Sequence, residues 1–172
     1  PQDQRRRSCQ TVMALIIERL AGLIAPVLCH MAEDIWQNLP YPVEETSVFH
    51  RGWPQVPAEW RDATLSAPVQ ELRELRAAVN KVLEDCRGRQ ELGASLEAAV
   101  RIEARRPELQ AALSWLSETG DAKVDGLRDW LLVSQLQIGG EPWAEVLASQ
   151  DDELASIEVS RARGTKCERC WH

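Results

Sequence analysis

Two cysteines near the end of the printed sequence have the spacing most typical of a chemical site. They lie in KCERCWH, residues 166–172, where Cys167 and Cys170 form a Cys-x-x-Cys motif. This spacing puts two sulfur atoms on one tight turn, which is half of a tetrahedral zinc site. The sequence has no second such pair, and His172 lies too near Cys170 to be a comfortable third ligand. We expect a zinc half-site that binds the metal weakly, with a redox dithiol or two unrelated thiols as alternatives.

The segment around the cysteine pair is basic, although the whole chain carries a net charge of −7. The acidic balance argues against nucleic-acid binding over the whole surface but leaves room for local basic patches that hold phosphates. Solvated charge is the simpler interpretation. We expect most of the seven tryptophans to lie in the core. Trp171 is the exception, and we consider it a candidate base-stacking residue. The candidate RNA contacts here are Arg161, Arg163, Lys166, Arg169 and Trp171.

A second basic feature follows one face of a predicted helix. At 100° per residue, four polar side chains fall within about 60° of arc beside the apolar face. They are Arg73, Arg76, Asn80 and Arg87. Such a ridge can contact the backbone and bases of an RNA. The competing interpretation is ordinary ion pairing, for example between Arg87 and Glu84.

Several function classes lack support in the sequence. It has three histidines and no serine in a nucleophile turn, and Gly139-Gly140 is not a phosphate-binding loop, so we expect no catalytic residue. No apolar run approaches the ~18 residues that span a bilayer, so no membrane partner is expected. Five cysteines, three of them isolated, are not typical of a secreted disulfide framework and favour the cytosol. Because the sequence starts at Pro1 without Met, we expect it to lie within a longer protein.

Apolar periodicity predicts a mainly α protein. Helical spacing predicts a helix over 11–39, interrupted near Pro26, and a second helix that begins at Ser66–Pro68 and ends near residue 90. A proline-rich but ordered connector, 40–68, joins them. These long helices need further partners to close a bundle.

The pattern then changes to that of a small α+β unit. Alternation predicts a strand over 96–103 and two further strands over 133–138 and 154–159. Helices are expected from Pro107 to Gly120 and around Leu127–Leu131. The expected organisation is a partial helical bundle at 1–92, an α+β unit at 93–163 and a truncated zinc-knuckle segment at 164–172.

Four segments together resemble one protein family, in the family's order. LAGLIAPVLCHMAEDIWQNLP (20–40) and VFHRGWP (48–54) resemble a helix and connector of class I aminoacyl-tRNA synthetases. LRAAVNKVLEDCRGRQELGASLEAAVRIEA (75–104) closely resembles the bundle helix and following strand of bacterial-type isoleucine–tRNA ligases. KCERCWH resembles the first half of that family's C-terminal zinc knuckle. The first three segments also occur in valyl-type enzymes, whereas the last favours the isoleucyl family.

The resemblance implies the C-terminal, anticodon-binding part of an enzyme that joins isoleucine to tRNA(Ile) using ATP. Its partners would be tRNA(Ile) and the rest of the parent synthetase, with no DNA. The sequence lacks the family's catalytic signatures, His-Ile-Gly-His and Lys-Met-Ser-Lys-Ser, and it lacks an editing domain. ATP would therefore be used by the parent's catalytic domain. This chain alone is expected to be inactive. The alternative functions are a free-standing helical interaction or dithiol redox module, and the equivalent part of a valyl-type synthetase.

Overall fold

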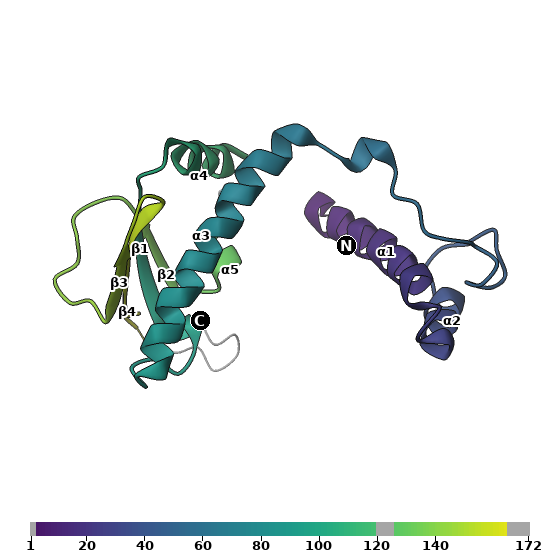
Figure 1. Ribbon diagram of the computed structural model, residues 1–172, viewed down its shortest axis with the longest axis horizontal. Coiled ribbons are helices and arrows are strands. Elements are labelled where there is room, and N and C mark those ends of the chain that lie inside the picture. Colours follow the sequence, from purple (N-terminus) through teal and green to yellow (C-terminus); the bar gives the residue numbers. More distant parts are fainter. Residues whose placement is uncertain (1–2, 120–125, 165–172) are drawn as a thin grey trace. The chain divides into compact units, whose positions relative to one another are not determined.

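A computed structural model describes residues 3–119 and 126–164 of the chain (Figure 1). Contacts divide the chain into two compact units, Pro1–Arg61 and Asp62–His172. Within the described ranges, no helix has both the length and the apolar character required to cross a bilayer. The expected fold class is confirmed, since long helices are combined with one small sheet. The domain boundary expected after residue 92 stays a prediction.

The first unit contains two helices, α1 (Gln4–Ile24) and α2 (Cys29–Gln37), and a short 3-10 turn, η1 (Ala58–Trp60). Asp3 caps α1, because its side chain accepts a hydrogen bond of 3.0 Å from the backbone N–H of Arg6. The chain leaves the helix around Pro26, which has no N–H to donate, so the expected interruption is confirmed. The small core of the unit consists of Ala21, Ala25, Ala32, Trp36 and Val48.

The connector after α2 is ordered by polar contacts with α1. The Tyr41 hydroxyl donates to the Glu18 carboxylate (2.8 Å), and its oxygen lies 3.1 Å from the backbone oxygen of Ala14. Arg51 forms an ion pair with the same carboxylate at 2.8 Å. At Gly22, an added Cβ would lie 2.5 Å from Pro54 Cγ, so the glycine allows the connector to pack closely on the helix. These contacts agree with an ordered connector.

The apolar stripe predicted along α1 is not covered by the described part of the first unit. Met13 and Ile16 are 63% and 60% exposed, and Leu20 is 41% exposed. The buried face of α1 is instead formed by the small residues Ala21 and Gly22.

The second unit begins with its longest helix, α3 (Ala63–Gly88). Asp62 caps this helix by accepting hydrogen bonds from the backbone N–H groups of Thr64 (2.8 Å) and Leu65 (3.4 Å). The predicted start at 66–68 was therefore wrong, and Pro68 lies inside the helix. Proline is tolerated there because it is only the sixth helical residue, so a single backbone hydrogen bond to the first turn is lost. Apolar spacing predicts one buried face from Val69 to Cys86. Val69 is 38% exposed, whereas the rest of this face is buried: Leu72, Leu75, Val79, Val82, Leu83 and Cys86.

A four-stranded sheet in the order β2-β1-β4-β3 completes the second unit, and α3 crosses one of its faces (Figure 1). β1 pairs in parallel with β2, which follows it after two helices, and antiparallel with β4, which also pairs antiparallel with β3. The three predicted strands are present, and β3 is an additional one. The elements are η2 (Ser95–Glu97), β1 (Ala98–Ala104), α4 (Pro107–Thr119), α5 (Gly126–Leu131), β2 (Gln135–Ile138), β3 (Ala148–Asp151) and β4 (Ala155–Arg161).

The two faces of the sheet differ in chemistry. Val100 and Ile102 of β1 and Val159 of β4 are completely buried in the core shared with α3 and α4. The intervening residues of these strands, including Arg101 and Glu158, point to the other face, because successive side chains alternate. Part of the polar face is covered by the segment 139–147, which contacts Arg101 and Glu158, and Arg101 is only 1% exposed.

Candidate RNA-binding surface

Three of the four predicted ridge residues form one polar strip on the outer side of α3. Arg73 and Asn80 are exposed and Arg76 is half-buried, beside a buried helix face that contains Leu72, Leu75 and Val79. Their spacing of three and four residues keeps them adjacent on a helix. Neither Arg73 nor Asn80 has a side-chain hydrogen bond or ion pair within residues 3–119 and 126–164. Both side chains are exposed on the described surface of α3. We call Arg73, Arg76 and Asn80 the α3 strip.

Arg76 is held in place by an aromatic ring. Its guanidinium carbon lies 5.0 Å from the ring centroid of Trp130, a residue of α5. Trp130 is itself 40% exposed, so this cation–π pair borders solvent. Periodicity did not reveal this pair, since the two residues lie on different helices. Trp130 thus adds an aromatic group to a surface that the sequence predicted as purely polar.

Arg87, the fourth predicted ridge residue, is engaged in internal contacts. Its guanidinium forms an ion pair with Glu84 and donates a hydrogen bond of 2.6 Å to the Ser95 hydroxyl. The sequence left ion pairing with Glu84 as the alternative to RNA contact for Arg87, and the structure contains this ion pair. Because Arg87 joins the end of α3 to η2, it contributes to the architecture whether or not it also contacts RNA.

Two acidic side chains of α3, Glu71 and Glu74, pair with an arginine from another element. Arg106, just before α4, forms ion pairs with Glu71 at 3.1 Å and Glu74 at 2.7 Å. The hydrogen bond from Arg106, followed by one from Gln70, lowers the pKa of Glu74. Both carboxylates therefore share one cationic partner, Arg106, and neither pairs with Arg73.

The predicted contacts at the end of the chain are only partly described by the structure. Arg161 ends β4 and Arg163 follows it, and both are exposed. The Arg163 backbone is fixed to β2, since its N–H donates to the Gln135 side chain at 3.1 Å and its carbonyl accepts from the same amide at 2.8 Å. The remaining predicted residues lie outside the described ranges: Lys166, Arg169, Trp171, Cys167 and Cys170. In the described part of the chain, no group of three or more histidine, cysteine or acidic side chains has a metal-site arrangement.

The expectation that most tryptophans belong to the core is met only by Trp36 and by Trp115, which packs against the core of the second unit. Trp36 is buried, but Trp53 is 64% exposed, Trp60 46% and Trp130 40%. Trp60 lies beneath a cation in the same way as Trp130, with the guanidinium carbon of Arg19 5.1 Å from its ring centroid. Exposed aromatic faces next to arginines are a common component of surfaces that bind single-stranded nucleic acid.

Comparison with known proteins shows that the sequence is similar to tRNA ligases. Residues 1–102 match the family model described as the anticodon-binding domain of tRNA ligase. Over its full length, the chain is 86% identical to an isoleucine–tRNA ligase of Parasynechococcus marenigrum strain WH8102 and 76% identical to one of Synechococcus sp. strain CC9311. Over 98% of its length it is 48% identical to an isoleucine–tRNA ligase of Prochlorococcus marinus strain MIT 9301.

The chain spans only 18% of the length of the first two relatives and 17% of the third. The family model, however, covers more than half of the chain, including α1, α2, α3 and most of β1. The chain therefore belongs to the family of anticodon-binding domains of tRNA ligases.

Proposed function

We propose that this chain is the tRNA-binding part of an isoleucine–tRNA ligase and that it binds the anticodon arm of tRNA(Ile) through the α3 strip. The observation that carries the proposal is the match of the whole chain to isoleucine–tRNA ligases at 86% and 76% identity. The names of these relatives favour an isoleucyl rather than a valyl parent.

The surface chemistry supports a role for the α3 strip in this binding. Arg73 and Arg76 supply positive charge for phosphates, and Asn80 supplies both donors and acceptors for base edges. Trp130 holds the Arg76 guanidinium, so less side-chain freedom is lost on binding. Arg161 and Arg163 add positive charge beside the polar face of the sheet, and we propose that Lys166, Arg169 and Trp171 extend this contribution.

The same proposal assigns ATP and isoleucine to a catalytic domain of the parent enzyme. Adenylate formation in class I ligases depends on groups that position the ATP phosphates, and the signatures that the resemblance associates with them do not occur in this sequence. We also propose that Cys167 and Cys170 form a zinc half-site. We propose a cytoplasmic location for the chain.

Equilibrium binding to transfer RNA tests the proposal. The full chain would be titrated with tRNA(Ile) and with a chimera that keeps the tRNA(Ile) body but carries the anticodon arm of another tRNA. We expect weak, salt-sensitive binding that is several-fold tighter for tRNA(Ile), because base contacts discriminate by roughly 1–3 kcal/mol each. Equal affinity for the two RNAs would contradict recognition of the anticodon arm.

The assignment of chemistry to another domain has its own assay. ATP–pyrophosphate exchange with isoleucine should stay at background for the purified chain. Exchange above background, retained through a second purification step, would contradict this part of the proposal.

A further inference from the structure

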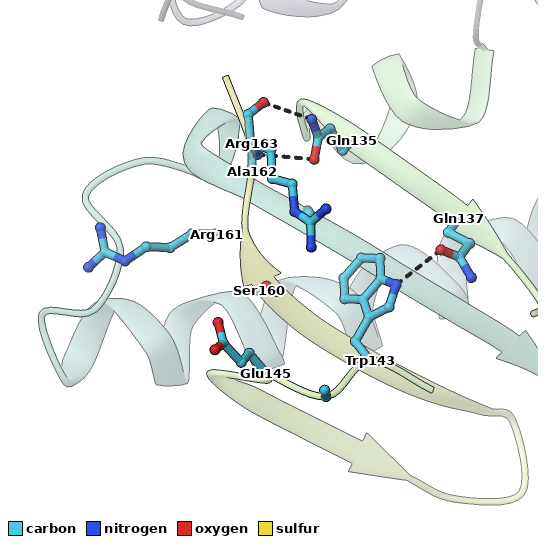
Figure 2. Close-up of a pocket in the computed structure, with 10 residues that line it drawn as sticks. Gln135, Gln137, Trp143, Glu145, Ser160, Arg161, Ala162 and Arg163 are labelled. Carbon is cyan, nitrogen blue, oxygen red and sulfur yellow. Dashed lines mark hydrogen bonds between the residues drawn. The ribbon is translucent and has the colours of Figure 1, made fainter. Parts of the chain in front are cut away.

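An open pocket lies on the polar face of the sheet, on the side opposite to α3. Its volume is about 730 Å³, within the range of ligand-binding pockets in general. The strands contribute Ala99, Gln135, Gln137 and Ser160 to its floor, while Trp143 and Arg163 stand at its sides (Figure 2). No residue of the pocket belongs to the α3 strip.

Two glutamines of β2 hold the side walls of this pocket. Gln137 accepts a hydrogen bond of 3.0 Å from the indole N–H of Trp143, which fixes the orientation of the ring. Gln135 makes two hydrogen bonds with the backbone of Arg163, which fix the starting point of that side chain. Residues two apart on a strand point to the same face, so the two glutamines position the tryptophan and the arginine over one surface.

A buried ionic network supports the segment that carries Trp143. Arg101 forms ion pairs with Glu158 at 3.2 Å and Glu103 at 2.8 Å, and also donates to the carbonyl oxygen of Gly140. Glu158 accepts a further hydrogen bond of 3.0 Å from the backbone N–H of Trp143. Gly140 has a φ of +77°, a conformation that favours glycine, where the chain turns back over the sheet. Both the backbone and the ring of Trp143 are therefore fixed before any ligand binds.

The groups that line the pocket suit a nucleotide. An indole ring offers a flat surface for stacking a base, the Ser160 hydroxyl can donate or accept, and the Arg163 guanidinium can bind a phosphate. Figure 2 shows the Arg163 side chain extending toward Trp143, whereas Arg161 points away from it. Within the described residues, no carboxylate pairs with either arginine. The one acidic side chain of the pocket, Glu145, lies on the far side from Arg163, and its carboxylate can accept from a base amino group.

We propose that this pocket binds one unpaired nucleotide of the RNA, with the base stacked on Trp143 and its phosphate bound by Arg163. This inference rests on the proposed function, because it takes the ligand to be part of the same RNA. A base within a duplex is already stacked on both sides, so only an unpaired nucleotide can offer its ring face to the indole. Since the pocket and the α3 strip lie on different sides of the sheet, each contacts a different part of the RNA.

Two RNA probes and three variants test the pocket in the full chain. The probes are a hairpin with the stem and unpaired loop of the tRNA(Ile) anticodon arm, and a blunt duplex that continues the same stem. The pocket variants are Trp143→Leu, which keeps apolar bulk but removes the stacking surface, and Arg163→Gln. The matched control is Arg105→Gln, which removes an exposed arginine that pairs with Asp151 at the other edge of the sheet. Thermal unfolding of every variant verifies that the fold is retained.

We expect Trp143→Leu to lose roughly tenfold in affinity for the hairpin, the typical effect of deleting one base-stacking contact. Arg163→Gln should also bind the hairpin more weakly, because it removes one phosphate contact. Affinity for the duplex should stay at the wild-type value, and the control should bind both RNAs like wild type. Hairpin affinities unchanged in both pocket variants would overturn this inference and leave the proposed function intact. Equal losses for hairpin and duplex would also overturn it, because the pocket would then not select unpaired RNA. Failure of the wild-type chain to bind either RNA would instead contradict the proposed function itself.

A crosslink provides a readout that a purely structural role of Trp143 would not produce. Hairpins that carry 5-iodouridine at single loop positions would be irradiated with the wild-type chain. We expect one position to crosslink to the peptide that contains Trp143, and this crosslink to be lost in Trp143→Leu. Crosslinks at every loop position to other peptides only would overturn the assignment.

Discussion

The guanidinium of Arg76 lies over the ring of Trp130, with 5.0 Å between its central carbon and the ring centroid. The contact joins α3 to α5 within one unit and fixes an arginine whose neighbours on the helix, Arg73 and Asn80, are exposed. A cation held in this way keeps its donors available for phosphates while its side-chain freedom is already reduced.

Replacement of Trp130 should therefore weaken RNA binding without direct loss of charge. We expect Trp130→Leu to reduce the affinity for tRNA(Ile) by about two- to tenfold, because immobilising one long side chain costs roughly 0.5–1.5 kcal/mol. Trp53→Leu, at a tryptophan that is 64% exposed in the other unit, is the matched control. Fluorescence anisotropy with labelled tRNA measures both. Wild-type affinity in Trp130→Leu would show that the stacking does not assist binding.

Loss of the buried guanidinium of Arg101 should destabilise the second unit. Arg101→Met removes the cation from the partly buried Glu158 and releases the segment at Gly140, so we expect a loss of about 2–4 kcal/mol in the free energy of unfolding. Arg105→Met breaks an exposed ion pair with Asp151 and should cost less than about 1 kcal/mol. Urea unfolding compares the two variants, and similar losses for both would contradict the structural role of Arg101.

The stability of the first unit should depend on the charge of Glu18. Burial raises the pKa of this carboxyl, but hydrogen bonds from Arg51 and Tyr41 and the nearby positive charges of Arg19 and Arg51 outweigh burial and bring the pKa below its ordinary value of 4.5. A lowered pKa in the folded state means that the stabilisation is complete above pH 4.5 and is lost as the pH falls through the folded-state pKa.

We expect Glu18→Gln to be less stable than wild type by about 1 kcal/mol at neutral pH. The difference should shrink below pH 4.5, because protonated Glu18 resembles glutamine. Urea unfolding at a series of pH values measures it, with Glu44→Gln, at an exposed glutamate, as the control. A difference that stayed constant down to about pH 3 would refute the assignment to Glu18.

Zinc binding by the chain should be weak. Cys167 and Cys170 supply two thiolates, whereas a structural zinc site uses about four ligands. Thiol labelling followed by mass spectrometry measures their accessibility with internal references, since Cys9 and Cys29 are exposed and Cys86 is buried. Burial raises the pKa of the Cys86 thiol, so this cysteine should react slowest. We expect Cys167 and Cys170 to be alkylated as readily as Cys9, with or without zinc. Zinc-dependent protection of both, with full occupancy, would contradict the half-site.

Local patterns predicted the elements whose apolar residues recur within one segment. The buried face of α3 and the alternation in β1 both gave the correct secondary structure. β3 has the sequence Ala-Ser-Gln-Asp, with no β-branched or aromatic residue, and forms because it pairs with β4, so no local pattern indicated it. The start of α3 was missed because Pro68 resembled a first-turn proline, whereas Asp62 is the cap.

The candidate site was predicted only where helical spacing determines it. Arg73, Arg76 and Asn80 share a face because the helix requires it. The Arg87–Glu84 ion pair also follows helical spacing, whereas no periodicity relates Arg87 to its second partner, Ser95. Trp130 and the pocket of Trp143 arise from contacts between elements far apart in the sequence. Arg101 illustrates the same difficulty, since its burial depends on contact with Gly140, in a segment far from it in the sequence.

The salt dependence of tRNA binding tests the central claim most directly. Wild type, Arg73→Ala plus Arg76→Ala, and a control with two ion-paired arginines replaced, Arg89→Ala plus Arg105→Ala, would be titrated with tRNA(Ile) at several salt concentrations. Both double variants remove two positive charges, so the net charge is matched. If the α3 strip contacts phosphates, its variant should bind more weakly and its slope of log affinity against log salt should fall by roughly one to two units, while the control keeps the wild-type slope. Equal affinity and equal slope for wild type and the α3 variant would contradict binding through α3.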